Sequence, residues 1–167
     1  NNLNKRREDS FSVIIALGSN FKRYRTVQKL KSKYKNISFP TMIDKSAIIG
    51  RNCSIGKGSI IMTNTYIGIN TNVKEFCIIN TKASIDHDSV MKNFSSLAPG
   101  VTTGGNVKIG ERTALCIGAI IKDKVSISYD TVIGANSFVN KNLRSTSVYY
   151  GSPAKLIRKR SISDEYL

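Results

Sequence analysis

Residues 48–90 read IIGRNCSIGKGSIIMTNTYIGINTNVKEFCIINTKASIDHDSV, and an aliphatic residue returns at every sixth position of this stretch. The series continues to Val139, and only Thr103 breaks it. A second column lies four residues after each member and holds only small or β-branched residues, from Cys53 to Ser137. The aliphatic series comprises Ile49, Ile55, Ile61, Ile67, Val73, Ile79, Ile85, Met91, Leu97, Ile109, Leu115, Ile121, Ile127, Ile133 and Val139.

A period of six residues fits neither an α-helix nor a coiled-coil heptad. It is typical of a parallel β-solenoid, in which each hexad supplies a short strand and a corner. The aliphatic residue then fills the narrow interior, and the small residue packs near the corner. Glycine after the aliphatic residue, as in Ile67-Gly68 and Ile109-Gly110, is expected to ease turns that need a positive φ. Neighbouring coils satisfy one another's backbone hydrogen bonds, so we predict a mainly β fold of stacked coils.

The [LIV]-G-x4 pattern resembles that of the left-handed β-helix, hexapeptide-repeat acyltransferase family. The resemblance implies triangular coils of about 18 residues, with three hexads per coil. It also implies a left-handed path, which departs from the usual right-handed crossover and does not follow from the spacing itself. We predict three parts: residues 1–42 as a partial Rossmann-like α/β unit, residues 43–144 as the β-helix, and residues 145–167 as a C-terminal closing segment.

The N-terminal region reads as a strand, a helix and a second extended segment. Residues 11–17 (FSVIIAL) form an apolar run typical of a buried strand. Apolar residues then recur at helical spacing over residues 21–35, and residues 37–43 read as extended. A partial α/β unit followed by hexads resembles the bacterial sialic-acid O-acetyltransferase and nucleotide-amino-sugar N-acetyltransferase group.

Within that resemblance, Gly18-Ser19-Asn20 and Arg23 resemble the group's G-[DN]-N-x-x-R element. The match implies that Ser19, Asn20 and Arg23 contact the sugar substrate. The glycine-rich loop with which the group opens is not found in this sequence, which leaves open a truncation or a different acceptor. At the other end, residues 151–155 (GSPAK) resemble the group's G-x-P-A-[KR] closing segment.

Composition narrows the classes of function. Three scattered cysteines and a single histidine disfavour a disulfide framework or a metal site, so we expect no metal. No apolar run reaches the length of a bilayer span, and no signal-peptide pattern opens the chain, so we expect a cytoplasmic protein. The net charge of +15 predicts an anionic partner. No nucleic-acid-reading motif accompanies this charge, which favours a phosphate-rich cofactor or a nucleotide sugar over nucleic acid.

Acyl transfer from a thioester needs a base and a donor for the oxyanion. His87 has the pKa range of a base near neutral pH, and TKASIDHDSV resembles the family's catalytic segment. Asp88 matches the acidic partner of that histidine, with Asp86 as the alternative. A step of about 18 residues from His87 reaches Gly105, whose N–H is the predicted oxyanion donor in the next coil. A tight turn that needs glycine is the alternative reading of Gly105.

The later coils and the closing segment carry the predicted cofactor contacts. By resemblance, backbone groups around Cys116-Ile117-Gly118-Ala119 and Gly134-Ala135-Asn136 hold the pantetheine arm of acetyl-CoA. Basic side chains are expected to meet the CoA phosphates, although each fits a solvated surface equally well. Ser96 stands where the group often has a second histidine, and is expected to face the acceptor. The predicted cofactor residues are Ile117, Gly118, Ala119, Ala135, Asn136, Lys141, Lys155 and Arg158.

The leading hypothesis is therefore an acetyl-CoA-dependent acyltransferase. The family that the sequence resembles forms homotrimers with sites between subunits, and we predict the same assembly here. The predicted acceptor is a nucleotide-linked amino sugar or a sialic-acid-like sugar of a bacterial surface polysaccharide. Two alternatives stay open: a non-catalytic hexapeptide-repeat scaffold, and an acetyltransferase for another small acceptor such as serine. The register of His87, Asp88 and Gly105 favours an enzyme over a non-catalytic scaffold.

Overall fold

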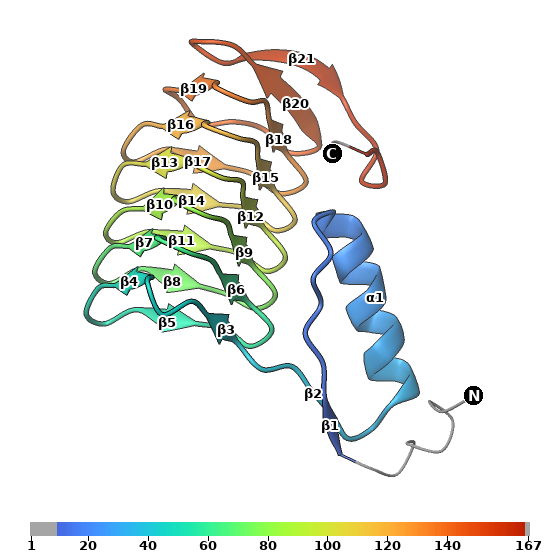
Figure 1. The fold of residues 1–167 in the computed structure, drawn as a ribbon. Helices are drawn as coiled ribbons and strands as arrows, with labels where there is room; N and C mark the ends of the chain where they lie inside the picture. The colour runs from blue at the N-terminus through green and yellow to red at the C-terminus, as the bar shows by residue number, and fades with distance from the viewer. Residues whose placement is uncertain (1–9, 166–167) are drawn as a thin grey trace.

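The computed structural model describes residues 10–165, which form a three-sided β-solenoid with a small α/β unit beside it (Figure 1). About six turns of parallel strands are stacked along the solenoid axis. One helix, α1 (Asn20–Lys33), lies along one side of the stack (Figure 1). No helix within the described range is long and apolar enough to span a membrane. The mainly β fold is confirmed, whereas the left-handed path stays a prediction.

Each coil contributes one short strand to each of three sheets, and strands one coil apart pair in parallel, as Ile85 pairs with Ile67. The six-stranded sheet contains β4 (Ile48–Ile49), β7 (Tyr66–Ile67), β10 (Ser84–Ile85), β13 (Thr102–Thr103), β16 (Ile120–Ile121) and β19 (Phe138–Val139). The five-stranded sheet contains β5 (Ser54–Ile55), β8 (Asn72–Val73), β11 (Val90–Met91), β14 (Lys108–Ile109) and β17 (Ser126–Ile127). The eight-stranded sheet contains β3 (Met42–Ile43), β6 (Ile60–Ile61), β9 (Ile78–Ile79), β12 (Ser96–Leu97), β15 (Ala114–Leu115), β18 (Val132–Ile133), β20 (Ser147–Tyr150) and β21 (Lys155–Lys159).

The six-residue series occupies the second position of each repeat strand and fills the interior. All its members from Ile61 to Val139 are buried, including Thr103. Burial of one such side chain contributes roughly 1.5–3 kcal/mol, so each central coil adds three contributions of this size. Ile43 and Ile49 are 45% and 37% exposed, because they lie in the first coil, which contacts a neighbour on one side only.

The corners use positive φ, but not at the glycines where we predicted it. Asn52, Asn70, Asp88 and Asn106 have φ between 56° and 59°, and asparagine and aspartate tolerate this left-handed region better than most residues. The glycine after the aliphatic residue serves close approach instead. A Cβ atom on Gly68 would lie 2.5 Å from the backbone nitrogen of the next coil. Stacked backbones therefore exclude a side chain there.

The N-terminal unit pairs β1 (Phe11–Ser12) in parallel with β2 (Ile37–Ser38), with α1 between them in sequence. The predicted helix is confirmed within two residues at each end. The predicted strand over residues 11–17 was too long, and only its first two residues are assigned to a strand. Pro40 cannot donate a ladder hydrogen bond, and the segment that carries it leads directly into the solenoid. One parallel pair and one helix leave the Rossmann-like assignment a prediction.

Candidate active site

His87 lies in the turn that joins β10 to β11, at the corner between the six-stranded and five-stranded sheets. Asp86 shapes this turn, because its Oδ1 accepts a hydrogen bond of 2.7 Å from the His87 N–H. The Asp88 N–H donates to the Ile69 carbonyl of the preceding coil at 2.9 Å. The His87 side chain is 47% exposed, so a substrate can reach the imidazole.

Asp88, rather than Asp86, pairs with the imidazole. Its Oδ2 lies 2.8 Å from Nδ1 of His87. This hydrogen bond, together with the negative charge of Asp86, raises the pKa of His87 above its usual value. The same bond is the main reason that the pKa of Asp88 is lowered. An ionised Asp88 can only accept, so Nδ1 carries the proton and Nε2 of a neutral His87 is left as the base.

Gly105 lies against the reactive edge of the ring. A Cβ atom built on Gly105 would be 2.4 Å from Nε2 of His87 and 2.5 Å from Cε1. The coil step predicted this neighbour, and the imidazole occupies the space that a side chain would need. The Gly105 carbonyl accepts from the Lys124 N–H at 2.9 Å, whereas its own N–H donates to no other residue in the range 10–165. That N–H is available for a ligand beside Nε2.

Thr103, the one break in the aliphatic series, supports the same corner. Its Oγ1 accepts a hydrogen bond of 3.2 Å from the Asp86 N–H and donates to the Gly104 carbonyl at 3.0 Å. A buried isoleucine could make neither bond. The interruption noted in the sequence therefore links the turn that carries His87 to the turn that carries Gly105.

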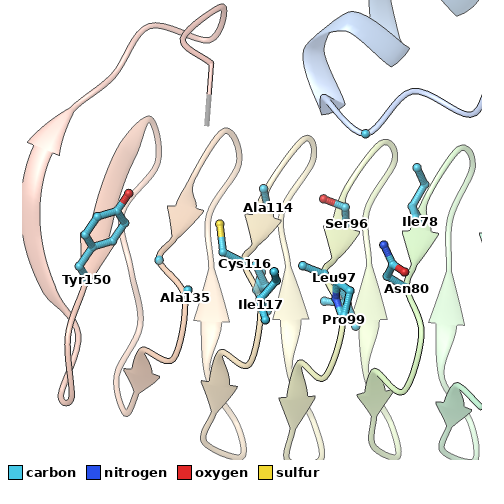
Figure 2. Close-up of a pocket in the computed structure, with 14 residues that line it drawn as sticks. Ile78, Asn80, Ser96, Leu97, Pro99, Ala114, Cys116, Ile117, Ala135 and Tyr150 are labelled. Atoms are coloured by element: carbon cyan, nitrogen blue, oxygen red, sulfur yellow. The ribbon is translucent and has the colours of Figure 1, made fainter. Parts of the chain in front are cut away.

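A cleft of about 420 Å³ opens on a different side of the molecule, over the eight-stranded sheet. Figure 2 shows side chains from β9, β12, β15 and the turns that follow them around this space, with Tyr150 at its C-terminal end. Its walls are mostly apolar, and none of the described residues that line it is charged. The lining residues are Gly18, Ile78, Asn80, Ser96, Leu97, Ala98, Pro99, Ala114, Leu115, Cys116, Ile117, Gly134, Ala135 and Tyr150.

Three of the predicted contact residues line this cleft: Ser96, Ile117 and Ala135. Gly118 and Asn136 lie in adjacent turns, where the Asn136 Oδ1 would be 2.2 Å from a Cβ on Gly118. Ala119 does not fit its predicted role, because its side chain is buried in the core, its N–H donates to the Cys116 carbonyl of the same turn, and its carbonyl accepts from the Thr102 N–H of the preceding coil. We therefore no longer assign Ala119 to the cofactor.

The predicted phosphate contacts are spread over the C-terminal end of the solenoid. Lys155 pairs with Tyr150 across the β20–β21 hairpin, which places it at the end of the cleft. Arg158 is 2.8 Å from Asp164, so it already has an acidic partner. Lys141 follows β19 of the six-stranded sheet and does not line the cleft. Position therefore favours Lys155 among the three.

The structure gives Asn20 and Arg23 a different place from the one predicted. Both side chains are buried, with at most 1% exposed. The Arg23 guanidinium donates to the carbonyls of Phe76 and Phe94 at 2.9 Å, and to that of Leu17 at 2.7 Å. These bonds hold the α/β unit against the solenoid and leave both residues poorly placed to meet a substrate. Ser19 caps α1, where its Oγ accepts from the Lys22 N–H.

Sequence reasoning missed several residues that the structure brings to these two places. Gly18 and Tyr150 reach the cleft from outside the repeat, and only the docking of the chain ends puts them there. Asn80 lies in a repeat turn that lines the cleft, two coils before Cys116 of the predicted cofactor turn, so the coil step could have pointed to it. Asn70 donates to Asp88 at 3.0 Å from one coil away, and it could have been found by stepping back from Asp88.

His87 and the cleft lie on different sides of a single chain. His87 projects from the corner between the six-stranded and five-stranded sheets, whereas the cleft lies over the eight-stranded sheet, which does not reach that corner. In a three-sided solenoid, that corner is opposite the eight-stranded sheet. Within one chain, the two features therefore face different directions.

Known proteins with sequences similar to this chain include acetyltransferases. No family model matches the chain. It is 35% identical over 102 residues to the bifunctional protein GlmU of Clostridioides difficile, and 30% identical over 124 residues to a chloramphenicol acetyltransferase of Klebsiella aerogenes. These matches cover 61% and 74% of this chain. The chain spans about a fifth of the length of the first curated relatives (21%) and 55% of the chloramphenicol acetyltransferase.

Solved structures extend the likeness beyond the repeat. PerB from Caulobacter crescentus, in complex with CoA and GDP-perosamine, superposes with a TM-score of 0.87 at 29% identity, over 92% of this chain and 73% of that one. The acetyltransferase domain of PglB from Neisseria gonorrhoeae, in complex with acetyl coenzyme A, gives 0.87 at 25% identity, over 93% and 75%. The repeat, the solenoid and these comparisons make the chain similar to the hexapeptide-repeat acyltransferase group, and within it to sugar N-acetyltransferases.

Proposed function

We propose that this protein transfers an acetyl group from acetyl-CoA to a nucleotide-linked amino sugar. The observation that carries the proposal is the register of three groups at one corner. Asp88 binds Nδ1 of His87 at 2.8 Å, and Gly105 packs against Nε2 in the next coil. A scaffold that only binds has no use for an oriented imidazole beside an available N–H. The GDP-perosamine and CoA bound to similar structures support the acceptor and donor classes.

In this mechanism His87 takes a proton at Nε2 from the sugar amine as the amine nitrogen attacks the thioester carbonyl. The carbonyl oxygen becomes negative, and the Gly105 N–H donates to it. The carbon–sulfur bond then breaks, and the imidazolium returns the proton to the departing CoA thiolate. Asp88 stabilises the imidazolium between these steps and keeps Nδ1 protonated. The products are the acetylated amine and CoA.

The donor arm is assigned to the cleft over the eight-stranded sheet. Its apolar walls suit a pantetheine arm, and Lys155 at its end suits a CoA phosphate. Because one chain holds the cleft and His87 on different sides, we propose a homotrimer of left-handed β-helices in which each site joins two subunits. The proposed setting is the bacterial cytoplasm, where acetyl-CoA is available, in the synthesis of a surface polysaccharide.

The test is a thiol-release assay with acetyl-CoA and a panel of acceptors. We expect CoA release with one or more nucleotide-linked amino sugars, GDP-perosamine among them, and none with the matched hydroxy-sugar nucleotides. Thermal stabilisation by CoA that falls with 3′-dephospho-CoA would support a phosphate contact. Acetylation of sialic acid or serine in preference to every amino sugar would contradict the proposed acceptor. No stabilisation by CoA, with tight binding of random oligonucleotides, would contradict the enzyme.

A further inference from the structure

A line of polar side chains runs up the corner that carries His87. Asn52, Asn70 and Asp88 occupy the same turn position in three successive coils, with φ of 59°, 58° and 56°. The Asn52 Nδ2 donates to Oδ1 of Asn70 at 3.2 Å. The Asn70 Nδ2 donates to Oδ1 of Asp88 at 3.0 Å. The solenoid thus stacks two amides directly behind the carboxylate that holds the imidazole.

The line has a direction. The carbonyl oxygen of the Asn70 amide accepts from Asn52, so its NH₂ group faces the opposite way, toward Asp88. Asp88 then uses Oδ1 for Asn70 and Oδ2 for Nδ1 of His87. With both carboxylate oxygens bound, rotation of the carboxylate would break two hydrogen bonds at once. The carboxylate plane is fixed by groups from two different coils.

We propose that Asn70 is a positioning residue, which fixes the Asp88 carboxylate so that His87 keeps its proton on Nδ1 and presents Nε2 toward Gly105. The consequence for catalysis rests on the proposed function, whereas the positioning itself does not. Asn52 acts one step further back, by orienting the Asn70 amide. The role assigned to Asn70 is distinct from general support of the turn, because the turn position itself needs only a residue that accepts positive φ.

Few other charged groups can influence this imidazole. Asp86 and Asp88 are its acidic neighbours on its own turn. The coil before it presents the uncharged Asn70, and the coil after it presents Gly105 and Asn106. Asp123 and Lys124 follow one coil further in the same positions, with opposite charges. A change at Asn70 therefore reaches His87 through Asp88.

The test uses the fact that His87 is the only histidine in the chain. One Hε1–Cε1 NMR signal then reports the pKa of His87, and the ring ¹⁵N shifts report which nitrogen carries the proton. The variant is Asn70→Gly, because glycine accepts the positive φ without strain and removes only the amide. Asn64→Gly is the matched control, since Asn64 has the same turn geometry with φ 55° at another corner.

We expect Asn70→Gly to lower the pKa of His87 toward its value in Asp88→Asn and to reduce the Nδ1–H tautomer, with Asn64→Gly unchanged. Asn52→Gly should shift both in the same direction by less. On an active acceptor, kcat should fall roughly 2- to 10-fold, the effect of one hydrogen bond. An unchanged or raised pKa in Asn70→Gly would overturn the proposal, since it would mean that Asn70 only competes for the carboxylate charge. The NMR result stands even if no acceptor is acetylated, so the two proposals fail separately.

Discussion

The corner that carries His87 and the cleft over the eight-stranded sheet divide the requirements of the proposed acyl transfer between them. The corner has an oriented imidazole, on a histidine that is half exposed, and an available N–H. The cleft has volume and apolar walls, but no charged residue of the range 10–165 lines it. Each region therefore supplies what the other does not, and the solenoid keeps them on different sides. This separation favours sites built from two chains.

The largest expected effect is the loss of the base. His87→Ala should lower kcat roughly 10²- to 10⁴-fold, since general base catalysis contributes about this much. Acetyl-CoA affinity should stay nearly unchanged, because the cofactor is held mainly by the cleft and by Lys155 rather than by His87. A turnover assay measures kcat, and calorimetric binding of CoA measures the affinity separately. A wild-type kcat in this variant would contradict the role of His87 as the general base.

Mixed assemblies test the division itself. Ala135→Phe should obstruct the cleft and reduce activity at low acetyl-CoA concentration, with His87 intact. If each site joins two chains, a 1:1 assembly of His87→Ala and Ala135→Phe subunits regains about a quarter of its sites. The activity of the mixture should then exceed the mean of the two parents several-fold. A mixture that equals that mean would place both halves of the site in one chain, and a monomer by light scattering would lead to the same conclusion.

Gly105→Ala should displace the His87 ring and leave the fold intact. Its Cβ would meet the mobile end of His87 at 2.4 Å, so the ring must move. Misplacement of a reacting group on this scale costs up to about 10²-fold in rate. Gly110→Ala is the contrast, because its Cβ would meet the Ser128 backbone at 2.4 Å. We expect a lowered Tm for Gly110→Ala and a lowered kcat at nearly constant Tm for Gly105→Ala.

The smallest effect is a displaced pH profile. Asp88 raises the pKa of His87, and the base acts in its neutral form, so the rate should climb as pH rises through that raised pKa. Asp88→Asn removes the cause of the rise, so the ascending limb should move to lower pH while the plateau falls. The limb should vanish in His87→Ala. A limb that stays in His87→Ala would belong to the acceptor amine rather than to the imidazole.

The interior of the solenoid could be predicted because its pattern is local and repeated. Every sixth residue faces the same narrow interior, so the aliphatic series marks strands and burial from Ile61 to Val139. The pairing of His87 with Asp88 and the proximity of Gly105 also follow from short spacings, one within a turn and one across a coil step. The glycine turns were misjudged, because the need at Gly68 is space against the next backbone rather than positive φ.

The docking of the chain ends could not be predicted in this way. Asn20 and Arg23 match a motif associated with substrate, yet their polar groups bind carbonyls of the solenoid 53 to 93 residues away. Tyr150 and Gly18 reach the cleft because separate segments fold back onto it. The sequence by itself determined the repeat, the buried interior and the chemistry available at one corner. Only the tertiary structure decided which polar groups are used up in packing and which sides carry the base and the cleft, because those outcomes depend on contacts between residues that no local period relates.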